Sequence, residues 1–275
     1  MAEGAKSISV DYDDQEAVAA ALKGQQFLAI VLSSMAGPDT HSNIVKGAIK
    51  AGVSYIMPTA YGWSVTNERL AKDDIYTKSA QAKVQEIQSL GGTSIVMVCG
   101  FWYEWSLALG LDCFGIDLKN HKAILFDDGN TKINSSTWEQ CGRALAALLS
   151  LPESGASPSL ADWKNKELRI ASFRMSQRDM LDSIHRVKGD SDKDWEITSE
   201  PAAQRYGDGM TMLSTGDRAG FIKAMYSRGF FANGDGDFET SDGLHNEVLG
   251  LSKGDMDAST KAAIGMVEAG WNPWA

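Results

Sequence analysis

Short apolar runs alternate with amphipathic stretches over the first hundred residues, and this alternation restricts the fold more than any other feature. Continuous apolar runs, typical of strands covered on both faces, occupy 27–32, 53–57 and 94–99. Helical patterns that stop near a glycine occupy 16–22, 42–51 and 72–90. A further short strand is expected at 7–10. This order predicts an α/β fold with a parallel sheet, helices on both faces and right-handed crossovers.

The second half of the chain has a different pattern. A strand is expected at 123–126 and a helix at 137–149, followed by a linker rich in Pro, Ser and Gly at 151–159. Beyond the linker we expect a strand at 168–171 and helices at 176–187, 217–230 and 255–267. These elements predict a smaller α+β part that packs on the first.

Charge and cysteine usage exclude several classes of function. The net charge is −10 and no long basic run is present, which argues against nucleic-acid binding. The three cysteines show no C-x-x-C spacing, as expected for reduced thiols in a cytoplasmic protein. The apolar runs are too short to cross a bilayer, and the four histidines form no i, i+4 pair. We therefore expect no membrane partner and no metal site.

One motif that commonly accompanies this fold class is missing. The glycine fingerprint G-x-G-x-x-G holds a dinucleotide pyrophosphate between a first strand and the following helix. No such spacing occurs near the N-terminus, where Gly4 and Gly24 stand alone.

Several stretches together resemble one family. They are Val53–Trp63, Cys99–Ser106, Asp127–Lys132, Ser172–Gln177 and Gly236–Glu239. The first resembles the strand and turn of NmrA-like and isoflavone-reductase-like proteins, which are atypical short-chain dehydrogenases, and the others resemble the fungal branch. The resemblance implies a Rossmann-like NAD(P)-binding fold whose smaller C-terminal part closes a substrate cleft.

In this alignment 7–10 matches the third strand of the family. The first strand, the glycine loop and the second strand would occupy about 50 residues upstream. We therefore expect an N-terminally truncated Rossmann-like domain over 1–150 and a substrate-cleft part over 151–275. Because unpaired buried strand edges are costly, we expect either a rearranged sheet or pairing with a partner chain, such as a homo-oligomer.

The resemblance also directs attention to a catalytic lysine. No tyrosine is followed four residues later by lysine, so the usual short-chain dehydrogenase pair is absent. The lysine of the isoflavone-reductase-like family falls on Ala80, and Ala60 replaces the usual Glu of the turn. Lys83 lies one helical turn beyond Ala80 and is either a displaced general acid or a solvated helix residue.

Cofactor contacts are expected where the buried strands end. Ser33 and Ser34 follow a strand at the edge where open α/β sheets bind ligands, and they either contact the cofactor or form a simple turn. The resemblance places the segment from Pro58 through Thr59 to Tyr61 near a nicotinamide ring, with Gly100 at the end of the next strand. The cofactor would be NADP or NAD.

Aromatic residues gather after the same strands: Trp63, Phe101, Trp102, Tyr103 and Trp105. Four of them fall within five positions, which does not fit one helical stripe. They either wall a cleft for a flat apolar substrate or pack the C-terminal part against the sheet.

Two functions remain open on this basis. The first is an NAD(P)-dependent reductase or isomerase-type oxidoreductase that acts on an aromatic or polycyclic small molecule. The second is a non-catalytic NmrA-like protein that senses the redox state of NAD(P) and binds a partner protein, which the loss of the lysine would suit.

Overall fold

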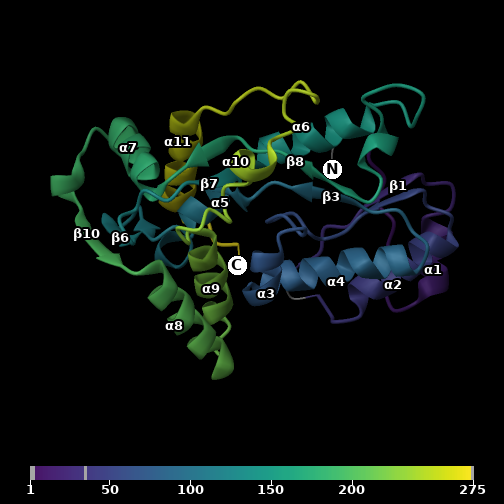
Figure 1. The fold of residues 1–275 in the computed structure, drawn as a ribbon, viewed down its shortest axis with the longest axis horizontal. Helices are drawn as coiled ribbons and strands as arrows, with labels where there is room; N and C mark the ends of the chain where they lie inside the picture. Colours follow the sequence, from purple (N-terminus) through teal and green to yellow (C-terminus); the bar gives the residue numbers. More distant parts are fainter. Residues whose placement is uncertain (1–3, 34–35, 274–275) are drawn as a thin grey trace.

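A computed structural model describes residues 4–33 and 36–273. Its main sheet is parallel and has the order β1 (Phe27–Ala29), β2 (Tyr55–Met57), β3 (Ile95–Val98) and β8 (Lys166–Arg169). A single bridge between Ile56 and Ser94 joins β2 to β3. Helices α1 (Gln15–Ala21), α2 (Thr40–Lys50), α3 (Glu68–Asp73) and α4 (Ile75–Ser89) lie on one side of this sheet, and α6 (Trp138–Leu149) lies on the other (Figure 1). The expected α/β architecture is confirmed.

The first strand is shorter and more open than its sequence suggests. β2 and β3 are fully buried, whereas every residue of β1 is only half-buried. Val31, which was expected in the strand, is 70% exposed. Within the described residues β1 pairs only with β2, so it forms an edge of the sheet.

The prediction of a strand at 7–10 is wrong. This segment has no regular structure, and the side chain of Ile8 is 65% exposed. Alternating residues favour a strand only where a neighbouring strand can pair with them, and in the part of the chain that the structure describes no strand pairs with this segment.

The long helix expected at 72–90 is two helices. Asp74 ends α3 and caps α4: its backbone is extended, and its carboxylate accepts from the backbone N–H and the hydroxyl of Thr77. An aspartate at a helix N-cap satisfies amide groups that have no partner inside the helix. Burial raises the pKa of the Asp74 carboxyl, against the hydrogen bonds from Thr77.

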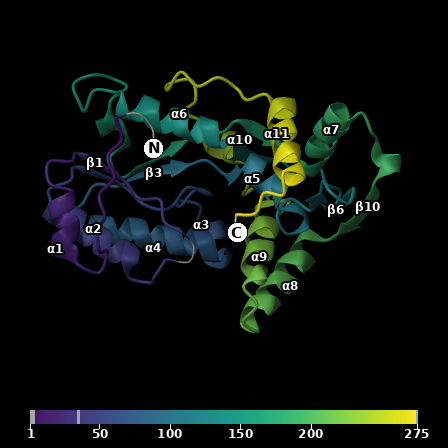
Figure 2. The same cartoon turned by 180° about the vertical axis from the view of Figure 1, so that it is seen from behind.

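Two small sheets extend the fold beyond β3. One has the order β4 (Phe101–Trp102), β7 (Ile133–Ser136), β9 (Phe173–Met175), and the other β10 (Glu196–Glu200), β6 (Lys122–Phe126), β5 (Ile116–Asp117). The helices around them are α5 (Tyr103–Ala108), α7 (Gln177–Lys188), α8 (Ala202–Ser214), α9 (Ala219–Gly229), α10 (Phe238–Asp242) and α11 (Met256–Glu268). Figure 2 shows α8 and α9 side by side at the end of the molecule away from α1.

Strand pairing crosses residue 150 in all three of these sheets. β3 pairs with β8, β7 with β9, and β6 with β10, so each sheet draws strands from both halves of the chain. The two parts expected from the sequence therefore share their sheets.

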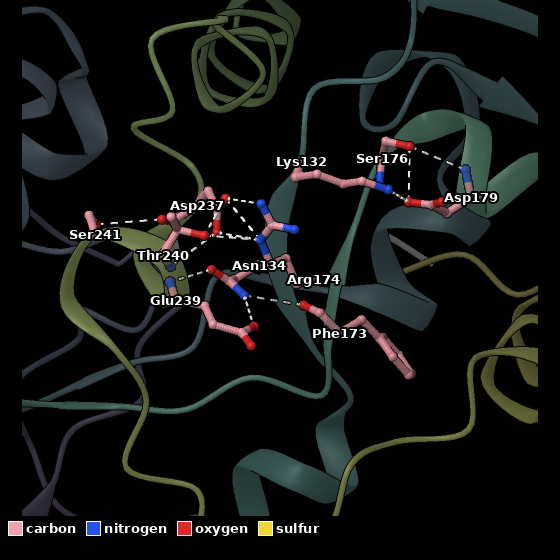
Figure 3. A network of polar contacts seen from close by, with 10 residues as sticks. All are labelled: Lys132, Asn134, Phe173, Arg174, Ser176, Asp179, Asp237, Glu239, Thr240 and Ser241. Atoms are coloured by element: carbon pink, nitrogen blue, oxygen red, sulfur yellow. Dashed lines mark hydrogen bonds and ion pairs between the residues drawn. The ribbon is translucent and has the colours of Figure 1, made fainter.

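A polar network fixes the C-terminal segment on β7 and β9 (Figure 3). Arg174 donates from its Nε and one terminal nitrogen to the carboxylate of Asp237, at 2.7–3.0 Å. The buried Asn134 accepts from the backbone N–H of Glu239 and donates to its carboxylate. Two of the stretches that carry the family resemblance, Ser172–Gln177 and Gly236–Glu239, thus lie in contact.

Candidate functional site

The turn after β2 is held across the carboxyl ends of β1 and β3. The hydroxyls of Thr59 and Tyr61 both donate to the carbonyl oxygen of Ile30, at 2.9 Å each. On the other side, the backbone N–H groups of Cys99 and Gly100 donate to the carbonyls of Tyr61 and Gly62. The turn therefore spans three strand ends, at the edge where open α/β sheets bind ligands.

Lys83 reaches this turn from the middle of α4. Its ammonium group donates to the carbonyl oxygen of Thr59 at 3.2 Å, and the residue is half-buried. Burial lowers the pKa of Lys83 below its ordinary value. The side chain of Ala80, where the family lysine was expected, is packed in the core and only 1% exposed. Lys83 is thus held against the turn and is not a freely solvated helix residue, although its chemical role stays a prediction.

The other expected cofactor contacts differ in accessibility. Ser33 is exposed just beyond the end of β1, Thr59 and Tyr61 are half-buried, and Pro58 is buried. Ser34 lies outside the described residues. Tyr61 is held by its bond to Ile30, and burial raises the pKa of its hydroxyl, so this group stays protonated.

Gly100 has a structural reason to be glycine. Its φ is +66°, and a Cβ at this position would lie 2.2 Å from the carbonyl oxygen of Asn134. Only glycine lets β3 turn so close to β7. Gly100 is itself buried, so it positions the strand end, and its contact with a cofactor stays a prediction.

The aromatic cluster divides into two groups. Trp63, Phe101 and Tyr103 are at most 6% exposed and belong to the core. Phe101 stacks on Tyr226 with ring centroids 3.8 Å apart, so these residues join the sheet to the C-terminal helices. For these three the structure shows core packing, and their contact with a substrate stays a prediction.

Trp102 and Trp105 are the two members that keep an accessible surface. Both are half-buried, and their rings meet edge to face at 6.5 Å. Trp105 also contacts Trp271. These two tryptophans stay candidates for substrate contact.

A polar cluster that the sequence did not indicate lies between α2 and α4. His41 is 7% exposed, and neither of its ring nitrogens has a hydrogen-bond partner among the described residues. Its Nδ1 is 3.7 Å from the carboxylate of Glu86, which accepts a hydrogen bond from Ser42. Burial, assisted by the charge of Lys83, lowers the pKa of His41 to about 4. The only sequence signal was a histidine at the start of an amphipathic helix.

A groove of about 600 Å³ lies elsewhere, beside β8. Its lining includes Trp163, Lys166, Arg169 and His245. The backbone N–H of Arg169 donates to His245 Nδ1, so the loop that carries His245 lies along the outer edge of the strand. This groove was not expected from the sequence.

Two acidic residues that follow Asn233 are used in ion pairs. Asp235 accepts from Arg228 and Arg69, and Asp237 accepts from Arg174. Within the described residues no group of three or more His, Cys, Asp or Glu side chains is arranged to hold a metal ion. No helix in the same part of the chain is long and apolar enough to cross a membrane.

Comparison with known proteins gives matches among solved structures alone. No family model and no curated protein sequence matches the chain. An NADPH-dependent quinone oxidoreductase from Escherichia coli, solved with NADPH, has a TM-score of 0.68 at 20% identity and covers 94% of this chain and 84% of its own.

Two further solved structures match at a similar TM-score and a similarly low identity. An isoflavone reductase has a TM-score of 0.67 at 17% identity, covering 90% of this chain and 78% of its own. A triphenylmethane reductase from Citrobacter sp., solved with NADP(H), has a TM-score of 0.62 at 19% identity and covers 92% and 82%. At these identities the similarity establishes a Rossmann-like fold.

Proposed function

We propose that this protein is an NAD(P)H-dependent reductase that acts on an aromatic or polycyclic small molecule. The observation that carries the proposal is the hydrogen bond between the Lys83 ammonium and the Thr59 carbonyl, at the carboxyl ends of the parallel strands. It holds an ammonium group at the edge where this class of sheet binds its ligand, which supports a role for Lys83 as proton donor. Two proteins with the same fold were solved with NADPH or NADP(H) bound, which supports the choice of cofactor.

The residues present fit the nicotinamide end of such a cofactor. Thr59 and Tyr61 fix the turn through the Ile30 carbonyl, and exposed Ser33 lies at the end of the neighbouring strand. When bound, the reduced nicotinamide supplies a hydride. Lys83 would donate the accompanying proton to an oxygen of the acceptor, and its lowered pKa makes it a better proton donor than an exposed lysine.

Trp102 and Trp105 would hold the acceptor. Rigid aromatic side chains bind flat apolar ligands with little loss of conformational entropy. Both tryptophans follow β3, beyond Gly100, and their edge-to-face contact gives a fixed surface. The solved structures with this fold include proteins named for quinones, isoflavones and triphenylmethane dyes, which are all aromatic or quinonoid.

Steady-state reduction of a panel of acceptors tests the proposal. NADPH consumption is followed with small quinones and polycyclic enones, and with aliphatic ketones as the control class. We expect turnover with the ring-containing acceptors and a raised KM for Trp102→Ala. Binding of NADPH without turnover on any acceptor would contradict the reductase and favour the second function, a redox sensor that binds a partner protein.

A further inference from the structure

The groove beside β8 lies at the outer edge of the main sheet. β8 pairs with β3 on one side, and in the part of the chain that the structure describes no strand pairs with its other side. The volume of about 600 Å³ is in the range of small-molecule sites. None of the residues proposed above to contact the cofactor or the acceptor lines this groove. A ligand bound here would therefore be independent of the proposed reductase function.

His245 presents to this groove a hydrogen-bonding group whose role is fixed. The backbone N–H of Arg169 can only donate, and it donates to His245 Nδ1 at 2.9 Å. Burial, assisted by the charge of Arg169, lowers the pKa of His245, so the ring is neutral at neutral pH. A neutral imidazole carries one ring proton, which must then lie on Nε2. The Nε2 atom of His245 is therefore a donor.

Two further donors of the lining come from the start of β8. Asn165, whose φ is +55°, turns its side-chain oxygen to the backbone N–H and the hydroxyl of Ser94, at 2.9 and 3.3 Å. This leaves the NH₂ group of Asn165 to donate to a ligand. Lys166 is exposed, and no ion pair between described residues includes it. Its ammonium group therefore adds a positive charge that the protein does not pair.

The carboxylates of the lining are already engaged. Glu167 is 5% exposed and accepts from the backbone N–H groups of residues 65 and 66, and it pairs with Arg169 at 3.2 Å. Asp162 is exposed and accepts from the backbone N–H of Ser159 at 2.9 Å. The groove thus offers free donors for an anion, while the charge of Asp162 disfavours a ligand with more than one negative charge.

We propose that this groove binds the carboxylate of a small aromatic acid that carries a single negative charge. The carboxylate accepts from the Lys166 ammonium, the Asn165 amide and His245 Nε2, and charge-assisted hydrogen bonds of this kind are roughly twice as strong as neutral ones. The aromatic ring lies against the apolar part of the lining, which consists of Pro158, Trp163 and Val248. Trp163 packs edge to face on His245, with ring centroids 5.8 Å apart, so the apolar wall and the donor are held together.

Ligand-observed NMR titration of the protein with benzoate tests this proposal. Benzamide, which has nearly the same shape and no charge, and phenyl phosphate, which carries close to two negative charges, are the comparison ligands. We expect saturable binding of benzoate, with both comparison ligands bound at least about tenfold more weakly. Absence of benzoate binding up to the millimolar range, or equal or tighter binding of either comparison ligand, would overturn the proposal.

Variants of the lining then test the assigned contacts. Lys166→Met removes the charge and keeps the length of the side chain, so we expect benzoate to bind about tenfold more weakly and benzamide to bind as before. His245→Asn keeps an acceptor for the Arg169 N–H and removes the Nε2 donor, so benzoate binding should also weaken. Lys164→Met is the matched control, because Lys164 lies over the ring of Tyr55 and outside the lining.

Equal benzoate affinity of Lys166→Met and the wild type, or an equal loss in Lys164→Met, would overturn the assignment. Circular dichroism confirms that each variant is folded.

One more variant separates the groove from the tryptophans proposed to hold the acceptor. An aromatic acid can also contact Trp102 and Trp105, so Trp102→Ala is titrated in parallel, and we expect its benzoate affinity to be unchanged. Loss of binding in Trp102→Ala, with full binding in Lys166→Met, would assign the acid to the tryptophans and overturn the proposal. Failure of the protein to bind NADPH would contradict the proposed function, while the benzoate titration would still decide the groove.

Discussion

Lys83 is the residue on which the proposed chemistry depends. Lys83→Met removes the proton donor and keeps most of the side-chain volume, so we expect turnover to fall by about 10²–10⁴-fold with the protein still folded. Lys78→Met, on the exposed side of the same helix, is the matched control and should leave turnover unchanged. Steady-state kinetics of both variants checks this, and equal activity of the Lys83 variant and the wild type would contradict the role.

The pH dependence of turnover also tests whether Lys83 acts as the general acid. A general acid must be protonated, so activity is lost as the pH rises through its pKa. Since burial lowers the pKa of Lys83 in the free protein, the alkaline limb of the kcat/KM profile should lie below pH 10.5. A profile that stays flat to that pH would assign proton transfer to another group.

His41 carries a prediction about stability. Its folded pKa of about 4 lies below the ordinary 6.5, so between these pH values the unfolded chain binds a proton that the folded chain excludes. Stability contributed by His41 is therefore unaffected above pH 6.5 and is lost as the pH falls toward 4. Urea unfolding of His41→Leu at pH 7 and pH 5 should show a smaller acid loss than the wild type. An equal loss in both would contradict the burial of a neutral imidazole.

At the scale of elements, the apolar patterns of the sequence predicted the positions of strands and helices well where the element is buried in the fold. β2, β3 and α2 lie where their apolar residues placed them, within two residues at each end. β1 was overestimated because a continuous apolar run does not reveal whether a neighbouring strand covers it. The break at Asp74 was missed because an aspartate inside a helical pattern also fits an exposed helix position, and its capping bond to Thr77 depends on the local backbone.

A buried ion-pair network joins α3 to the segment that follows α9. Arg228 is 1% exposed and donates to Asp73 and Asp235 at 2.7 Å each. The Asp235 side chain is fully buried, so Arg228→Ala leaves its charge with only one of its two arginine partners, Arg69, at a cost of about 3 kcal/mol. Urea unfolding measures this, with Arg186→Ala as the control, because the Arg186–Asp257 pair is exposed and should contribute below about 1 kcal/mol. Equal effects of the two substitutions would contradict the structural role of the network.

At the scale of the whole molecule, the sequence indicated the sheet class but not how the halves interlock. Strands β8, β9 and β10 each pair with a strand from before residue 150, and such long-range pairing leaves no local pattern. The same limit applies to the site. The Thr59–Tyr61 turn and Lys83 were singled out as candidates from the sequence, whereas the His41–Glu86 cluster and the groove beside β8 arise only from packing.

The open edge of β1 leads to a prediction about the oligomeric state of the whole molecule. The backbone N–H and C=O groups of Leu28 face β2. Those of Phe27 and Ala29, on either side of Leu28, therefore point away from the sheet. Exposed strand edges are templates for pairing with another chain. We expect a homo-oligomer or a complex through this edge, which light scattering with size exclusion would measure. A stable monomer at micromolar concentration would contradict it.

We expect the carboxyl ends of β1, β2 and β3 to form a binding site for a reduced nicotinamide cofactor. Calorimetric titration of the protein with NADPH measures this binding, with Thr59→Val as a variant that removes one bond holding the turn to Ile30. We predict saturable one-to-one binding that is weakened in the variant. Absence of heat up to millimolar NADPH, or equal binding by both proteins, would contradict the account.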